Sequence, residues 1–294
     1  MAKQEYGNEN ISALKGADRV RLRPAVIFGS DGIEGCQHSF FEILSNSIDE
    51  AREGYGTEIE VTRYLDKSIE IKDYGRGMPL DFNEKEQRYN WELIFCELYA
   101  GGKYKTNSGE NYEFSLGLNG LGACATQYSS SFMDVTVCRD GKKYTMHFEK
   151  GNPVGELQVE AFRHRHKGTD IKWRPDLDVF TDINIPLDYY REVLKKQAVA
   201  NAGLKFVLYN QTPEGWDMEE FYYENGIVDY IAEISDGKEI TSPHVFDAER
   251  RGRDREDKPE YKVKMQFAFC FNNEINMLEY YHNYSFLEHG GAPD

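Results

Sequence analysis

The feature that most constrains the fold of this chain is a pair of strand-like segments separated by only two residues. Residues 59–65 (IEVTRYL) and 68–74 (SIEIKDY) are rich in β-branched and aromatic side chains, and Asp66 and Lys67 lie between them. A two-residue link between two such runs is typical of a β-hairpin. The segment therefore predicts two neighbouring antiparallel strands of a sheet.

Helical segments and a second hairpin accompany this one along the chain. Gly141 separates the strand-like runs 132–140 and 142–150, which predicts the second hairpin. Further strands are expected over residues 168–176, 204–210 and 261–271, and helices over residues 36–53, 91–100, 123–130 and 187–201. The charged stretch 249–260 is expected to be a solvated connector. This order predicts an α+β fold, with helices on one face of a mixed, mostly antiparallel sheet.

Composition narrows the functional classes. Hydrophobic residues make up 40% of the 294 residues, which is enough for a packed core. No apolar run reaches the length of a membrane-spanning helix, and the N-terminus lacks a signal-peptide pattern, so we expect a cytoplasmic protein without a membrane partner. The five cysteines are scattered, which favours reduced thiols over disulfides or a zinc site. A net charge of −16 argues against a broad electropositive surface that holds nucleic acid by itself.

Residues 38–50 (HSFFEILSNSIDE) place a carboxylate and an amide one helical turn apart. At about 100° per residue, Glu42, Asn46 and Asp49 share one side of a helix, and His38 lies one turn upstream. Glu42 could activate a water while the amide oxygen of Asn46 takes a Mg²⁺ ion that carries phosphates. An ordinary amphipathic surface helix would show the same polar stripe.

A second signal follows the strand 68–74. Asp73 stands at the end of this strand and is followed by Gly75-Arg76-Gly77-Met78-Pro79. A carboxylate followed by glycines that let the backbone approach a flat ligand suits recognition of the exocyclic amine of a purine. An ordinary turn between strand and loop is the alternative.

Two weaker signals complete the set. In the glycine-rich segment 100–122, the spacing of Gly117, Gly120 and Gly122 would let backbone N–H groups surround phosphate oxygens. A flexible connector is the alternative, and the segment does not match the P-loop string. Gly168-Thr169 places a hydroxyl at the start of a strand, where it could support Asp73 directly or through a water.

Together these signals resemble the GHKL (Bergerat) ATP-binding fold shared by gyrase B subunits, Hsp90, histidine kinases and MutL. Within that superfamily the chain is similar, over nearly its whole length, to the B subunits of bacterial type IIA topoisomerases (DNA gyrase and topoisomerase IV). The similar segments are ISALKGADRVRLRP (11–24), FFEILSNSIDEA (40–51), KDYGRGMP (72–79), LYAGGKY (98–104) and the final FNNEI…EHGG. The resemblance implies an ATP-binding and ATP-hydrolysing gate whose ATP-driven dimerisation couples to DNA strand passage.

The resemblance also assigns roles to residues. Glu42 would be the general base with His38 as its partner, and Asn46 would hold Mg²⁺. The ATP site as a whole would include Tyr6, Asn46, Glu50, Asp73, Arg76, Gly77, Met78, Pro79, Ile94, Gly102, Lys103, Tyr112, Gly117, Leu118, Asn119, Gly120, Leu121, Gly122, Ala123 and Thr169. Arg76 and Arg139 would line the rim where coumarin-type inhibitors compete.

The same resemblance implies three parts and several partners. Residues 1–20 would be a dimerisation arm, residues 21–222 the ATP-binding domain, and residues 223–294 the truncated start of an α/β transducer domain. Tyr6 and Ile11 in the arm would reach the nucleotide site of a second copy in an ATP-dependent homodimer. The topoisomerase A subunit and DNA would bind through regions outside this chain.

The chain departs from the family pattern in three places. The family's lid string G-G-L-H-G-V-G has Leu116 in place of its first glycine and Asn119 in place of its histidine, and Glu113 replaces the usual lid lysine. R-P-G-M-Y-I-G reads R-P-A-V-I-F-G. The Q-T-K string of the second domain, whose lysine contacts the γ-phosphate, does not occur, so we expect ATP binding with slow hydrolysis.

Two other functions fit the same fold. A MutL-like or Hsp90-like ATP-dependent clamp would act on protein partners, and continuation of the gene into a metal-binding Toprim domain would argue against it. A histidine kinase is disfavoured, because the phospho-acceptor helix is missing and the C-terminal strands are extra.

Overall fold

The computed structural model describes residues 13–100, 120–162, 167–253, 255–256, 260–282 and 285–286. Its helices are α1 (Asp18–Arg21), α2 (Pro24–Phe28), α3 (Ile33–Arg52), α4 (Asn90–Cys96), α5 (Gly122–Tyr128), α6 (Leu187–Ala200) and α7 (Ile227–Ser235). Its strands are β1 (Glu58–Arg63), β2 (Ile69–Asp73), β3 (Phe82–Asn83), β4 (Arg88–Tyr89), β5 (Ser130–Arg139), β6 (Lys142–Glu149), β7 (Asn152–Ala161), β8 (Gly168–Pro175), β9 (Lys205–Thr212), β10 (Gly215–Phe221), β11 (His244–Gly252), β12 (Tyr261–Phe269), β13 (Tyr281–His282) and β14 (Ser285–Phe286).

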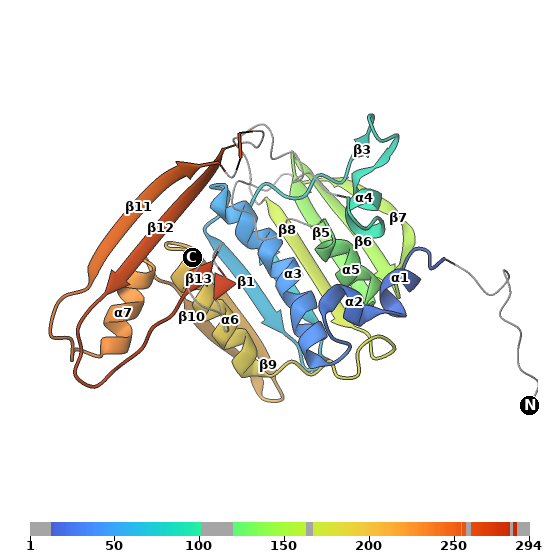
Figure 1. Cartoon of the computed structure of the whole chain (residues 1–294). Coiled ribbons are helices and arrows are strands. Elements are labelled where there is room, and N and C mark those ends of the chain that lie inside the picture. The colour runs from blue at the N-terminus through green and yellow to red at the C-terminus, as the bar shows by residue number, and fades with distance from the viewer. Residues whose placement is uncertain are drawn as a thin grey trace, which may run out of the picture.

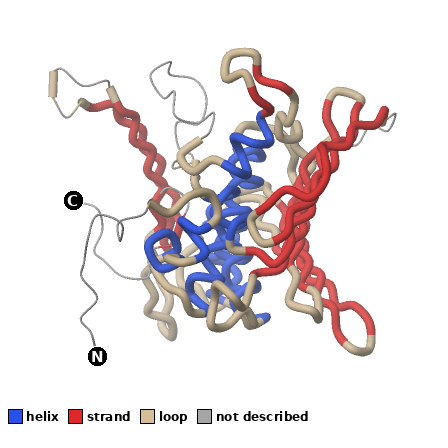
Figure 2. The backbone as a smooth tube through the Cα atoms, turned by 90° about the vertical axis from the view of Figure 1, so that its right-hand side faces the viewer, coloured by secondary structure: helices blue, strands red, loops and turns tan. Residues whose placement is uncertain are grey.

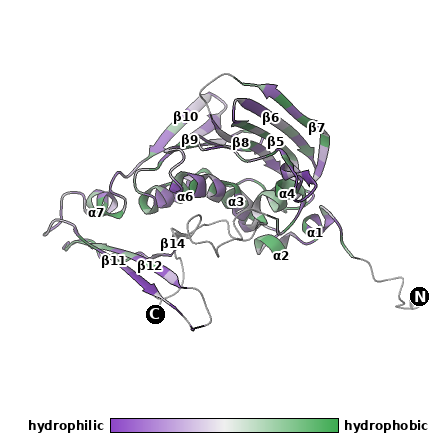
Figure 3. Ribbon diagram, turned by 90° about the horizontal axis from the view of Figure 1, so that it is seen from above, coloured by the Kyte–Doolittle hydropathy of each residue, from purple (hydrophilic) through white to green (hydrophobic). Residues whose placement is uncertain are grey.

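One eight-stranded sheet organises the chain, in the order β10-β9-β1-β2-β8-β5-β6-β7. Strands β1 and β9 pair in parallel, and the other neighbours in this sheet are antiparallel. Seen from above, helices α3, α4 and α6 lie on one side of the curved sheet (Figure 3), and the edge-on view separates the helical layer from the strands of the sheet (Figure 2). The expected α+β sandwich on a mixed, mostly antiparallel sheet is confirmed.

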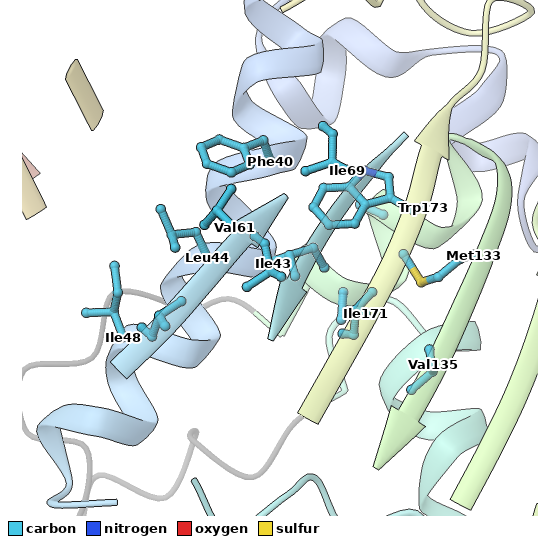
Figure 4. Close-up of a cluster of buried hydrophobic side chains, with 14 of the residues drawn as sticks. Phe40, Ile43, Leu44, Ile48, Val61, Ile69, Met133, Val135, Ile171 and Trp173 are labelled. Atoms are coloured by element: carbon cyan, nitrogen blue, oxygen red, sulfur yellow. The ribbon is translucent and has the colours of Figure 1, made fainter. Parts of the chain in front are cut away.

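Helix α3 crosses the middle of this sheet and forms the centre of the core (Figure 1). Phe40, Leu44 and Ile48 repeat every four residues and are fully buried, because this spacing aligns them on one helix face. They meet inward-facing side chains of β1, β2, β5 and β8, among them Val61, Ile69, Met133, Val135, Ile171 and Trp173 (Figure 4). The opposite face of α3 is thereby held at a fixed height above the sheet.

The hairpin expected over residues 59–74 is present, with Val61 opposite Ile71 in the β1–β2 register. Two expectations need correction, and strand β7 was not among the expected elements. The helix expected over 91–100 ends at Cys96, where Glu97 turns to an extended conformation. Strand β7 was not expected, because nearly all of its side chains are exposed and give no alternation. The connector expected from residue 249 starts later, because residues 249–252 continue β11 beside β12.

The last described part of the chain stands beside the main sheet (Figure 1). Helix α7 packs on α6 and on β12, and β11 and β12 form their own two-stranded antiparallel ribbon. No described helix combines the length and the apolar character that crossing a membrane requires.

Candidate functional site

Helix α3 carries one end of the candidate site. Nε2 of His38 lies 3.1 Å from Oε1 of Glu42, and Nδ1 lies 3.2 Å from the carbonyl oxygen of Phe28 at the end of α2. One turn further along, the amide nitrogen of Asn46 donates to the carbonyl oxygen of Glu42 at 3.0 Å. The side-chain atom that Asn46 can offer to a metal is therefore its amide oxygen.

The two contacts of His38 favour a protonated ring. Both partners accept hydrogen bonds when Glu42 is ionised, so a ring that bonds to both must carry two protons. The hydrogen bond to Glu42 raises the pKa of His38, against the lowering effect of burial, and the carbonyl of Phe28 adds to the rise. In its protonated form the ring would donate to the carboxylate of Glu42 and orient it.

A small cavity of about 90 Å³ opens beside this pair. Its lining comes from the end of α2, from α3 and from the start of α5: Ile27, Phe28, His38, Glu42, Leu121, Gly122 and Ala125. The main chain of Gly122 lies so close that a Cβ there would come within 2.1 Å of Oε2 of Glu42. The carboxylate thus faces a confined space next to the first turn of α5.

Asp73 forms the other end of the site, at the end of β2. Its Oδ1 accepts the backbone N–H groups of Gly75 at 3.0 Å and of Thr169 at 3.1 Å, and its Oδ2 accepts the hydroxyl of Ser47 at 3.1 Å. Burial raises the pKa of Asp73, aided by the charge of Glu50, whereas these three donors lower it. A carboxylate held by three donors in a buried position is an oriented acceptor for one more N–H group.

The wall beside Asp73 is built from backbone at close range. Gly77 has φ +80°, and a Cβ there would lie 2.9 Å from the carbonyl oxygen of Cys138, so only glycine fits. The hydroxyl of Thr169 accepts the N–H of Met78 at 3.1 Å, and Nη1 of Arg139 donates to the carbonyl of Gly77 at 2.8 Å. Thr169 therefore reaches Asp73 through its main chain, and its hydroxyl fixes the Gly77–Met78 segment.

Glu50 and Arg76 close the outer edge of this end. Glu50 accepts the backbone N–H of Arg76 and two guanidinium N–H groups, each at 2.8 Å. Burial would raise the pKa of Glu50, but the hydrogen bonds and the charge of Arg76 hold it below its usual value. The pair is a bidentate fork, the strongest geometry for such an interaction.

The remaining expected residues fall into two groups. Pro79 follows Met78 in the same loop and Ile94 lies on α4. Gly120 and Leu121 immediately precede α5, and Ala123 lies in its first turn. Seven lie outside the described residues: Tyr6, Gly102, Lys103, Tyr112, Gly117, Leu118 and Asn119.

Sequence reasoning missed three participants. Ser47 is buried beside Asp73, Tyr55 stacks on Arg76, and Phe28 supplies a carbonyl to His38. Ser47 contacts Asp73 and Tyr55 contacts Arg76, which lie 26 and 21 positions further along the chain, so no local sequence pattern predicts these contacts. Ser47 lies about 100° around α3 from Asn46, among the buried side chains, and a polar residue at such a position was the one available signal.

A metal ion at this site would find few ligands among the described side chains. Among the described residues there is no cluster of three or more His, Cys, Asp or Glu side chains suited to a metal ion. Mg²⁺ commonly uses one or two protein ligands and completes its shell with water and substrate phosphates. A single amide oxygen from Asn46 fits that pattern.

The fold and the site define a class of protein. A mixed sheet under helices, with a buried carboxylate at one end of α3 and a Glu–His pair at the other, is the GHKL ATP-binding sandwich. No protein-family model matches the sequence. The chain is nevertheless a relative of the B subunits of bacterial type IIA topoisomerases, as its similarity to individual proteins shows.

Three relatives illustrate this relationship. The chain is 32% identical to the B subunit of DNA gyrase from Thermotoga maritima over 275 residues, which are 92% of this chain and 42% of that protein. It is 35% identical to the gyrase B subunit of Metamycoplasma hominis over 292 residues (97% and 44%). It is 33% identical to the B subunit of DNA topoisomerase 4 from Enterococcus faecalis over 283 residues (95% and 39%). The chain thus spans less than half the length of these relatives.

Solved structures agree with the sequence relatives. The 43K ATPase domain of Thermus thermophilus gyrase B, in complex with an aminocoumarin, superimposes with a TM-score of 0.65 at 30% identity, over 83% of this chain and 60% of that one. The ATP-binding domain of Francisella tularensis topoisomerase IV, with a small-molecule inhibitor, gives 0.64 at 26% identity, over 79% and 60%.

Proposed function

We propose that this chain is the ATP-binding and ATP-hydrolysing gate of a type IIA topoisomerase. The observation that carries the proposal is that two acidic side chains with different surroundings lie along α3. Asp73 lies near one end of α3, is buried, accepts hydrogen bonds from three donors and suits the amino group of adenine. Glu42 lies on α3 two turns before Glu50 and faces a small cavity. A nucleotide lying along α3 would have its base at Asp73 and its terminal phosphate near Glu42.

The proposed hydrolysis uses Glu42 as the general base. A water between Glu42 and the γ-phosphate would transfer a proton to the carboxylate as its oxygen attacks phosphorus and the bond to the β-phosphate oxygen breaks. His38 would hold the carboxylate in the attacking direction through the contact at 3.1 Å. When bound through Asn46, Mg²⁺ would offset charge on the phosphates.

The wider role rests on the relatives. The second copy of this chain, the topoisomerase A subunit and DNA are the proposed partners, with residues 1–20 as the dimerisation arm and Mg²⁺ as the metal. Residues 21–222 would form the ATP-binding domain. The separate ribbon β11–β12 with α7 supports a second unit starting near residue 223, the proposed beginning of the transducer domain. A cytoplasmic location accords with this role.

A titration with the non-hydrolysable analogue AMP-PNP, followed by light scattering, tests binding and dimerisation together. We expect saturable binding and an approximate doubling of the scattering mass. A chain that binds no adenine nucleotide would refute the proposal. We also expect slow steady-state hydrolysis by this chain alone, and vigorous turnover by the pure monomer would contradict that part.

The alternative is an ATP-dependent clamp of the MutL or Hsp90 type. Its partner would be a protein, so ATP would drive dimerisation without any effect on DNA topology. Relaxation or supercoiling assays of the full-length protein with its A subunit separate the two functions, because only the topoisomerase changes the linking number.

A further inference from the structure

Tyr55 lies outside the expected site but contacts its edge. It stands on the turn after α3, and its ring packs against the guanidinium of Arg76, whose Cζ lies 3.8 Å from the ring centroid. Tyr55 is 42% exposed, so this stacking occurs at the surface of the molecule. A guanidinium over an aromatic face at this distance is a favourable cation–π arrangement.

The turn that carries Tyr55 is held in place by backbone contacts. The N–H of Tyr55 donates to the carbonyl of Glu50 at 3.2 Å. Gly56 has φ +87°, and a Cβ there would lie 3.1 Å from the carbonyl carbon of Tyr74, so the turn sits directly against the segment leading to Arg76. The ring position is therefore set by the main chain.

Arg76 is consequently fixed in two independent ways. Glu50 holds the edge of the guanidinium through two hydrogen bonds at 2.8 Å, and Tyr55 packs on its face. The two hydrogen bonds to Glu50 set the direction in which the guanidinium of Arg76 points. The stacked ring of Tyr55 opposes rotation of the guanidinium plane. Both constraints converge on one side chain.

Arg76 lies where the site passes from the interior to solvent. Asp73 is only 7% exposed, whereas the side chain of Arg76, three positions later, is 38% exposed. A ligand confined to the base end would bond to Asp73. A ligand whose planar group continues outward would meet the guanidinium of Arg76.

We propose that Tyr55 is a positioning residue at the rim of the site: by holding the plane of the Arg76 guanidinium, it sets the affinity for ligands whose planar aromatic group extends outward from the base pocket. This inference rests on the proposed function, since it presumes a base bound at Asp73. It assigns Tyr55 little influence on the nucleotide itself.

The test compares two ligands and two genetic backgrounds. Calorimetry with an aminocoumarin and with AMP-PNP would be run on the whole chain, on Tyr55→Leu and on Tyr55→Phe. We expect Tyr55→Leu to weaken aminocoumarin binding about three- to fivefold and AMP-PNP binding less than about twofold, in keeping with a surface cation–π contact. Tyr55→Phe keeps the ring and should match the parent.

The decisive arm repeats Tyr55→Leu in an Arg76→Ala background. If Tyr55 acts through Arg76, the loss disappears there, because double-variant cycles isolate the shared interaction. An equal loss in both backgrounds, an equal loss for both ligands, no loss at all, or a parent chain that binds AMP-PNP but no aminocoumarin would each overturn the proposal. Tyr222→Leu, at another exposed tyrosine (50% exposed), controls for removal of a surface ring.

A parent chain that binds neither ligand would refute the proposed function instead. The two failures are thus distinguishable, because the role of Tyr55 is judged only against a parent that binds nucleotide.

Discussion

The main chain of Gly122 lies directly against the carboxylate of Glu42. A Cβ on Gly122 would come within 2.1 Å of Oε2 and 3.0 Å of the Cβ of Glu42. Residue 122 therefore sets where the carboxylate can point, although it carries no side chain. The first turn of α5 and the part of α3 that carries Glu42 are therefore packed as one unit.

Gly122→Ala should displace the carboxylate of Glu42 without unfolding the chain, because alanine is well tolerated in a helix. We expect single-turnover ATP hydrolysis to fall about 100-fold, as a displacement of about 1 Å commonly costs. AMP-PNP affinity and the thermal midpoint serve as controls. Unchanged hydrolysis would show that the carboxylate can move aside without effect.

Glu42→Ala should keep nucleotide binding and abolish the remaining turnover, since the side chain acts on water and not on the base. Calorimetry with AMP-PNP and a phosphate-release assay measure the two properties separately. A loss of affinity above about tenfold (~1.4 kcal/mol) would instead make Glu42 a binding or structural residue.

Asp73→Asn should weaken AMP-PNP binding about 100-fold or more (~2.7 kcal/mol). The new amide places an N–H₂ group among the donors of Ser47, Gly75 and Thr169, which leaves buried donors unpaired. Asp134→Asn, on the outer face of the sheet, is the matched control. Equal AMP-PNP affinities for the two variants would show that Asp73 takes no part in base recognition.

Asp170 should make folding stability depend on pH. Burial next to Glu70 raises the pKa of Asp170 from 3.8 to about 7. Between these values the folded state binds more protons than the unfolded state, so stability is greatest at the acidic end and falls as the pH rises towards 7. Urea midpoints at about pH 5 and about pH 8 measure the difference. Asp170→Asn should reduce it, and an unchanged difference would assign the effect to other groups.

Local patterns predicted the elements whose signal is contained in a few residues. The apolar spacing of Phe40, Leu44 and Ile48 defined α3, and the two-residue link defined the β1–β2 hairpin. Glu42, Asn46 and Asp73 could be proposed as site residues from sequence because short motifs carry their chemistry, and their roles stay predictions. The edge strand β7 was invisible, since a strand without a buried face has no alternation to detect.

Contacts between distant segments account for what was missed. Ser47 looked like one more polar residue on α3 until β2 brought Asp73 to it, and Tyr55 looked like part of a loop. The role of Thr169 was also refined, because register and not residue type decides that its main chain meets Asp73. Tertiary geometry, which single-sequence patterns do not encode, selects these partners.

The hydrogen bonds to Asp73 come from segments that are synthesised at different times. Thr169 follows Asp73 by 96 positions, and the pairing of β2 with β8 closes that distance. Pairing between strands distant in sequence forms late, because the entropy cost of closing the intervening loop comes before the stabilising contacts. A nascent chain still lacking β8 therefore lacks one of the donors that orient Asp73, and if Asp73 receives adenine as proposed, full nucleotide affinity requires residue 169 to have left the ribosome.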